Sequence, residues 1–113
     1  MNSINEVKTN NNKILYLSFN QDNSCFAIAT ENGFHIFETF PFKNKYERKM
    51  GGGIGQIEML YRSNLLALIG GGEIPKYDDN KVIIWDDYYA KIICEIKLSS
   101  PLKNVKLKKI KYL

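Results

Sequence analysis

The sequence predicts an all-β fold in which a unit of four short strands occurs twice. Apolar runs alternate with clusters of turn formers, and no window has the i, i+3, i+4, i+7 spacing of an amphipathic helix. The pattern begins again after about 41 residues, a repeat length typical of four-stranded propeller blades. Trp85-Asp86, near the end of a strand in the second unit, is the dipeptide after which WD repeats are named. These features indicate a WD-repeat β-propeller fragment: about two four-stranded antiparallel blades plus the start of a third.

The first blade is assigned to residues 13–50, after a polar N-terminal tail at residues 1–12. Turn formers at 20–23 and at Glu31-Asn32-Gly33 separate its apolar runs, and the Asn-Gly pair tolerates the positive φ of a two-residue hairpin. A charged stretch with Tyr46 as its one large apolar residue predicts a short, exposed outer strand. The four strands are predicted at 13–19, 25–29, 34–37 and 43–49.

The second blade is assigned to residues 51–100, and residues 101–113 are expected to start a third. Alignment of the blades places Phe19 on Leu60 and the run 34–37 on 82–85. Trp85 and Asp86 are interpreted as structural residues, the ring packing between blades and the carboxylate bonding to nearby groups. The strands are predicted at 57–61, 65–69, 82–87 and 91–98.

So few blades leave an apolar sheet face and a sheet edge uncovered. A blade cannot bury both of its faces alone, and a propeller needs about four or more blades to close. We therefore expect the chain to be poorly soluble or to self-associate when it is made alone.

The sequence contains no pattern typical of an active site. Cys25 and Cys94 lie in apolar runs and are expected to be buried, reduced thiols, and His35, the only histidine, is interpreted as structural. No metal-ligand spacing occurs, and no nucleophile has a visible base. The glycine run 51–53 is followed by a β-type run instead of a helix, so a connection between blades is favoured over a phosphate loop. We expect no enzymatic activity, no metal and no cofactor.

The net charge of +4 raises the question of nucleic acid or anionic lipid as a partner. Much of the excess consists of lysines between residues 103 and 111, which alternate with apolar residues as on the solvent face of a strand. We therefore expect no nucleic-acid partner. No apolar run is long enough to span a membrane, and the N-terminus lacks the apolar stretch of a secretory signal, so the cytoplasm is the expected compartment.

Three stretches, taken together, resemble one family. They are FNQDNSCF at 19–26 with ENGF at 31–34, IEMLYRSNLLALIGGG at 57–72, and PKY at 75–77 with NKVIIWDD at 80–87. The chain resembles the N-terminal blades of the PROPPINs, also called WIPI proteins, the phosphoinositide-binding WD-repeat β-propellers of autophagy. The similarity runs in one register from about Leu15 to Leu107.

The resemblance implies a seven-bladed propeller that binds phosphatidylinositol 3-phosphate and the 3,5-bisphosphate, peripherally on pre-autophagosomal or endosomal membranes. In that family the lipid sites flank an arginine pair in a Phe/Leu-Arg-Arg-Gly motif of the fifth and sixth blades. The two arginines of this chain, Arg48 and Arg62, are not adjacent. No residue here is assigned to lipid binding, and membrane recognition is expected to need blades absent from this sequence.

The resemblance also implies a protein partner, the autophagy lipid-transfer protein that extends the autophagosome membrane. Asn20 and Asp22 match the family positions of that contact, and the loop 72–77 is a second candidate surface. Both residues are equally explained as turn formers bonded to their own backbone. The alternative function is an incomplete propeller fragment that serves only as a structural or protein-interaction module with no lipid role.

Overall fold

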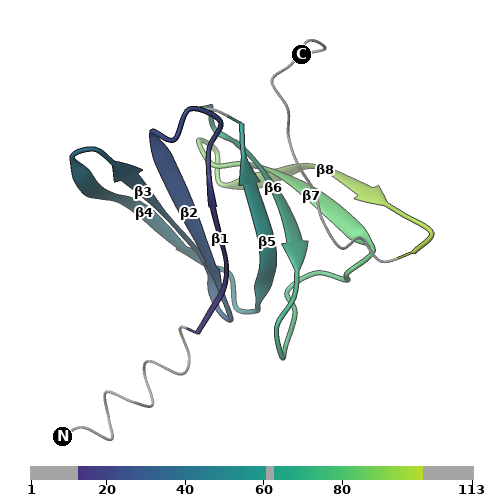
Figure 1. Cartoon of the computed structure of the whole chain (residues 1–113). Helices are drawn as coiled ribbons and strands as arrows, with labels where there is room; N and C mark the ends of the chain where they lie inside the picture. Colours follow the sequence, from purple (N-terminus) through teal and green to yellow (C-terminus); the bar gives the residue numbers. More distant parts are fainter. Residues whose placement is uncertain (1–12, 61–62, 101–113) are drawn as a thin grey trace, which may run out of the picture.

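The computed structural model describes residues 13–60 and 63–100, which form two four-stranded antiparallel sheets (Figure 1). Strands follow chain order across each sheet, and this confirms the predicted all-β fold of propeller blades. The expected tail at 1–12 and the expected start of a third blade at 101–113 lie outside the described residues. The strands are β1 (Ile14–Phe19), β2 (Cys25–Thr30), β3 (Gly33–Thr39) and β4 (Phe42–Lys49) in blade 1, and β5 (Ile54–Met59), β6 (Leu65–Gly70), β7 (Lys81–Asp86) and β8 (Lys91–Lys97) in blade 2.

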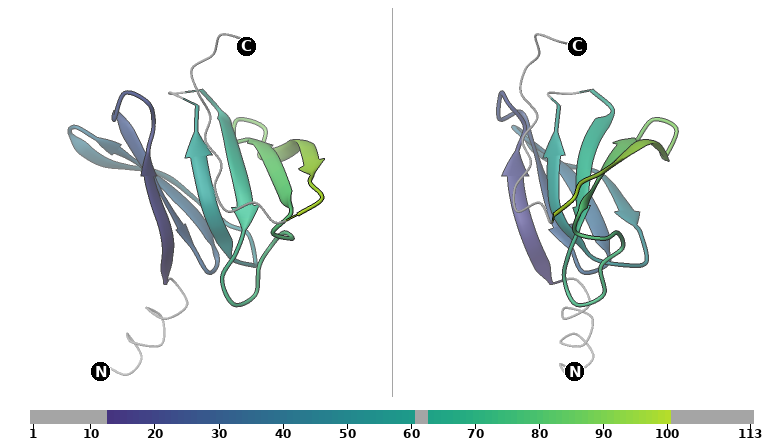
Figure 2. Two further views of the ribbon diagram at one scale, coloured as in Figure 1. Left: turned by 45° about the vertical axis from the view of Figure 1, so that its right-hand side comes forward. Right: turned by 90° about the vertical axis from the view of Figure 1, so that its right-hand side faces the viewer.

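The two sheets stand face to face. β1 and β5 are neighbours at the centre of the molecule, whereas β4 and β8 form its outer edges (Figures 1 and 2). β5 packs against β1 and β2 of blade 1, and the hydrophobic core lies in this contact. Within the described residues, no helix is long and apolar enough to cross a membrane.

Alternation along β2 shows how blade 1 contributes to the core. In β2, Cys25, Ala27 and Ala29 are at most 3% exposed, while Phe26 and Ile28 between them are only half-buried. We call the side of blade 1 that carries the buried set the inner face; it packs against blade 2. We call the opposite side the open face. The open face carries Leu17, Phe19, Phe26, Ile28, His35 and Phe37.

The register of blade 1 recurs in blade 2. Ile14 opposes Thr30 as Ile54 opposes Gly70, 40 residues further on, and each pairing is followed by a bulge. In the outer strands the shift is 48 residues, because the β6–β7 loop is longer than the two-residue β2–β3 turn. The superposition of 34–37 on 82–85 is confirmed, since Phe37 opposes Phe26 as Trp85 opposes Leu66.

Three details of the sequence analysis need correction. Phe19 is equivalent to Met59 and not to Leu60, because β5 already begins at Ile54 inside the glycine-rich stretch. Cys94 is exposed, since it lies on the edge strand β8, all of whose residues are exposed; Cys25 is buried as expected. Gly33, with φ of 149°, is the first residue of β3, so the β2–β3 turn consists of Glu31 and Asn32.

The β1–β2, β3–β4, β5–β6 and β7–β8 connections lie at one end of the molecule, which we call the turn face (Figure 1). Of the β5–β6 connection, the structure describes Leu60, Ser63 and Asn64. Backbone hydrogen bonds join these connections in pairs: Thr39 N donates to Ser24 O at 3.0 Å, and Asp87 N donates to Asn64 O at 2.9 Å. The β2–β3 turn and the β6–β7 loop lie at the opposite end. Both sequence-predicted partner residues, Asn20 and Asp22, therefore lie at the turn face.

Candidate functional site

Asn20 and Asp22 lie in the β1–β2 turn of the turn face, but their surroundings differ. Asn20 is 2% exposed: its Oδ1 accepts from Cys25 N at 3.0 Å and its Nδ2 donates to Ser24 Oγ at 2.9 Å. Asp22 is exposed, and its Oδ1 accepts from Ser24 N at 3.0 Å. Both side chains thus bond to their own turn, and Asp22 alone of the two also presents a carboxylate at the surface.

The turn is fixed to both blades. Gln21 Nε2 donates to Met59 O of blade 2 at 2.9 Å, and Thr39 Oγ1 donates to Asn23 O at 2.7 Å. Asn23 has φ of 60°, a left-handed conformation that asparagine tolerates better than most residues. A turn anchored to both blades can hold the Asp22 carboxylate in one place, as a binding surface requires.

The strongest polar contact between the blades is an ion pair. Arg48, on the outer strand β4, donates through Nε to Asp87 Oδ1 at 2.8 Å and through Nη2 to Asp87 Oδ2 at 2.9 Å. The carboxylate is 8% exposed, and it also accepts from Trp85 Nε1 at 2.9 Å. This bidentate geometry holds the outer part of blade 1 against the end of β7.

Aromatic rings surround this ion pair. Trp85 meets Phe34 of blade 1 edge-on, with ring centroids 6.4 Å apart, and Arg48 lies 5.4 Å from the ring centroid of Tyr46. Burial, together with the negative charge of Asp87, raises the pKa of Tyr46, while hydrogen bonding to Asp87 raises the pKa of Arg48. The predicted position of Trp85 between the blades is confirmed. Asp86 bonds locally as expected, accepting from Tyr88 N at 2.9 Å.

Two further polar contacts link the inner strands. Tyr16 OH donates to Glu58 Oε2 at 2.9 Å, and Ser18 Oγ donates to Ile57 O at 2.8 Å. Burial and the bond to Glu58 raise the pKa of Tyr16. The blades are thus joined by polar contacts both near the centre and at the rim.

Sequence reasoning missed the Arg48–Asp87 pair. The two residues are far apart in sequence, and the two-residue period of a strand gives no cross-blade partner. One feature of the sequence pointed to it: Asp87 directly follows the Trp85-Asp86 dipeptide, although Asp86 alone suffices for the local hydrogen bond to Tyr88 N. An arginine on the outer strand of the preceding repeat is the natural counter-charge for that extra acid.

The second candidate surface, 72–77, belongs to the β6–β7 loop at the end opposite the turn face. Its backbone is tied to blade 1, because Glu73 N donates to Glu31 Oε1 at 3.0 Å, and to the start of blade 2, because Gly53 N donates to Ile74 O at 2.8 Å. The Ile74 side chain is 74% exposed. The turn face and this loop lie at opposite ends of the blades (Figure 1).

In the part of the chain that the structure describes, the potential catalytic and metal-ligating side chains are dispersed. His35 Nε2 lies 2.6 Å from Asn44 Oδ1, and its ring stacks on Phe37 at 4.2 Å, as a structural histidine would. Among residues 13–60 and 63–100, no group of three or more potential metal ligands occurs. The arrangement of the described residues suits binding by an exposed, fixed turn.

Two packed four-stranded blades of this kind define a segment of a β-propeller. No family model matches the chain. Its sequence is 46% identical over 107 residues to SVP1-like protein 2 of Saccharomyces cerevisiae, an alignment that covers 87% of this chain and 24% of that protein. Its fold is similar to the crystal structure of Kluyveromyces marxianus Hsv2, with a TM-score of 0.75 and 28% identity over 87% of this chain and 30% of that one.

A more distant structure, the complex of Atg21 with the coiled coil of Atg16, has a TM-score of 0.63 and 24% identity over 79% of this chain and 29% of that one. It supports the fold alone. These relatives are PROPPINs, and the chain spans about a quarter of the length of the curated relative it matches.

Proposed function

We propose that the chain is part of a PROPPIN and contributes two blades to a propeller scaffold that acts in autophagosome formation. The observation that carries this proposal is the 46% identity with SVP1-like protein 2 over 107 residues. It is supported by the Hsv2-like packing of the two blades. The full propeller would be cytoplasmic and peripheral on membranes that contain phosphatidylinositol 3-phosphate or the 3,5-bisphosphate.

In this proposal the lipid site lies outside the chain. Phosphoinositide headgroups are best held by arginines that donate in pairs to phosphate oxygens. Arg48 is the one arginine of the described residues, and its donors already face Asp87. The same observation favours the second candidate function, an interaction module with no lipid role.

The piece itself would supply partner surface, with the autophagy lipid-transfer protein as the expected partner. Asp22 is proposed as the contact residue, because its carboxylate is exposed on a turn anchored to both blades. Asn20 is proposed to act indirectly, by holding the turn that presents Asp22.

A pull-down with the purified lipid-transfer protein of Saccharomyces cerevisiae tests this division of roles. Asp22→Ala is expected to reduce capture about tenfold without loss of stability, since an exposed contact residue at an interface is worth roughly 1–2 kcal/mol. Asn20→Ala is expected to reduce capture together with stability, because buried Cys25 N loses its acceptor.

Asp79→Ala is the matched control, an exposed aspartate at the other end of the molecule. Unchanged capture by Asp22→Ala would remove the turn from the partner surface. A loss of capture with Asp79→Ala instead would move the contact to the β6–β7 loop.

A further inference from the structure

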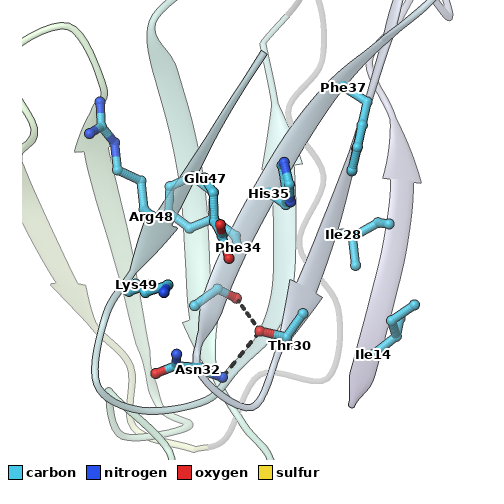
Figure 3. Close-up of a pocket in the computed structure, with 11 residues that line it drawn as sticks. Ile14, Ile28, Thr30, Asn32, Phe34, His35, Phe37, Glu47, Arg48 and Lys49 are labelled. Carbon is cyan, nitrogen blue, oxygen red and sulfur yellow. Dashed lines mark hydrogen bonds between the residues drawn. The ribbon is translucent and has the colours of Figure 1, made fainter. Parts of the chain in front are cut away.

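The two outer edges of the molecule differ in their side chains. The edge strand β4 carries exposed lysines and a glutamate, and Figure 3 shows the Arg48 side chain extending from it towards blade 2, where it bonds to Asp87. The edge strand β8 instead presents Ile92, Ile93 and Ile96, which are 43%, 50% and 47% exposed. Charges protect an edge strand from pairing with another chain, whereas apolar side chains on an exposed edge favour such pairing. Of the two described edges, β8 is therefore the one that favours association.

The backbone of β8 determines which of its residues can pair. Leu98, directly after β8, donates its N–H to the carbonyl oxygen of Asn80, directly before β7, at 2.8 Å. Successive residues of an antiparallel strand direct their N–H and C=O groups to opposite sides. The N–H and C=O groups of Glu95 and Lys97 are therefore directed away from β7, towards the outer edge of the sheet. A further strand at this edge would bond to these two residues.

The side chains of this segment alternate in kind. Glu95 and Lys97 share one face with Lys81, since Lys81 Nζ lies 3.8 Å from Glu95 Oε2 and Lys97 is opposite Lys81 in the ladder. Ile96 and Leu98 lie on the other face, with the apolar cluster of blade 2 that is turned away from blade 1. The two charges are thus of opposite sign on one face, with an apolar residue between them on the other.

This order of residues is complementary to itself. In an antiparallel pair of two copies with the two-fold axis at Ile96, Glu95 of each copy lies opposite Lys97 of the other, and Cys94 lies opposite Leu98. The Glu95–Lys97 pairs are also the positions at which the outward-directed backbone groups meet, so hydrogen bonding and charge favour the same register. An axis at Glu95 or at Lys97 would instead place like charges opposite each other, which is unfavourable.

The equivalent register is unfavourable on β4. Arg48 opposes Phe34 as Ile96 opposes Val82, so Arg48 has the position of Ile96 in the repeat. Two copies that paired through β4 would bring two arginine side chains together at the axis. The self-complementary edge is therefore specific to blade 2.

We propose that two copies of the chain pair antiparallel along residues 94–98, so that their second sheets join into one continuous sheet. The strand that occupies the β8 edge is a second copy, because this segment matches itself both in charge and in backbone bonding. So short a segment buries little surface, and the dimer is therefore weak, with a dissociation constant of about 100 µM. The contact lies on the outer edge of blade 2 and leaves the open face of blade 1 uncovered.

Charge exchange tests this proposal, with sedimentation equilibrium of the full chain as the measurement of the dissociation constant. Glu95→Lys and Lys97→Glu are each expected to weaken the dimer about tenfold, because each change creates two like-charge pairs. An equimolar mixture of these two variants is expected to recover the affinity of the unaltered chain, since every charge then lies opposite its counter-charge. Lys91→Glu is the matched control, a charge reversal on β8 outside residues 94–98, and it should leave the affinity unchanged.

A cysteine at the proposed axis tests the register. Ile96→Cys/Cys94→Ser is expected to form a disulfide-linked dimer on oxidation with copper phenanthroline, because a non-hydrogen-bonded antiparallel pair has Cα atoms about 4.5 Å apart, within disulfide range. The unaltered chain is expected to form no such link through Cys94, which lies opposite Leu98 in this register. Cys25 does not interfere, since it is buried.

Three results would overturn the proposal. A chain that stays monomeric at every concentration would leave the β8 edge to a different polypeptide. Failure of the mixed variants to recover the affinity, or rapid cross-linking of the unaltered chain through Cys94, would exclude this register. Self-association that Leu17→Lys/Phe19→Lys abolishes, while Glu95→Lys leaves it unchanged, would place the contact on the open face of blade 1 instead. Trp85 fluorescence reports whether each variant keeps the contact between blades 1 and 2.

Discussion

Replacing Arg48 by methionine is expected to lower the free energy of unfolding by about 2 kcal/mol, because the nearly buried Asp87 carboxylate is left without its counter-ion, whereas the Arg48 side chain, 35% exposed, is partly screened by solvent. Trp85 Nε1 would remain as a donor, but one neutral donor does not compensate a charge that is 8% exposed. The double change Arg48→Met/Asp87→Leu is expected to cost less, about 1 kcal/mol, since it removes both charges and keeps apolar volume. Urea unfolding followed by Trp85 fluorescence measures the three free energies.

Lys81→Met is the control for this comparison. Lys81 pairs with Glu95 at 3.8 Å, but that carboxylate side chain is 47% exposed, so the change is expected to stay within about 0.5 kcal/mol. Equal effects of Lys81→Met and Arg48→Met would contradict the assignment of Arg48–Asp87 as the main polar link between the blades.

Gly33→Ala is expected to lower the free energy of unfolding by about 3 kcal/mol or more, because two penalties combine. Gly33 has φ of 149°, a conformation that residues with a side chain rarely adopt. A Cβ at this position would also collide with Arg48 O of the paired outer strand and lie 3.0 Å from Met50 N, just after that strand; both are backbone atoms. Thermal unfolding followed by far-UV circular dichroism measures the loss.

Gly51→Ala separates the two penalties. Gly51 also has positive φ, 78°, but a Cβ there would have no atom within 4 Å. Gly51→Ala is therefore expected to lower the free energy of unfolding only by the cost of the positive φ, about 1 kcal/mol. If Gly33→Ala and Gly51→Ala lowered the free energy of unfolding equally, close packing of β4 against Gly33 would not be the reason that a glycine is required there.

Local patterns predicted the strands well because strand alternation and turn chemistry act over a few residues. The apolar runs and the 20–23 and 31–33 turn formers placed β1, β2 and β3 near their observed bounds. The start of β5 was missed, because Gly55 inside a strand weakens the β pattern. The exposure of Cys94 was missed for a different reason: an apolar run on an edge strand has the composition of a buried one.

Contacts between blades cannot be predicted from such local patterns. Nothing in the local sequence of Tyr46-Glu47-Arg48 identifies Asp87 as its partner, and only the packing of the two sheets brings them together. The turn residues were predicted at the surface as a pair, yet the fold buries Asn20 and exposes Asp22. Sequence reasoning found the candidate turn, and the structure distinguishes its supporting residue from the one that can make contact.

The central claim is that this piece supplies scaffold and partner surface while membrane recognition needs polypeptide outside it. Flotation with vesicles that contain phosphatidylinositol 3-phosphate, or a charge-matched control lipid, tests it most directly. The account predicts no selective flotation of the chain alone, and selective flotation of a chimera in which the chain replaces the aligned quarter of Saccharomyces cerevisiae SVP1-like protein 2. Selective flotation of the chain alone, or none by the chimera, would contradict it.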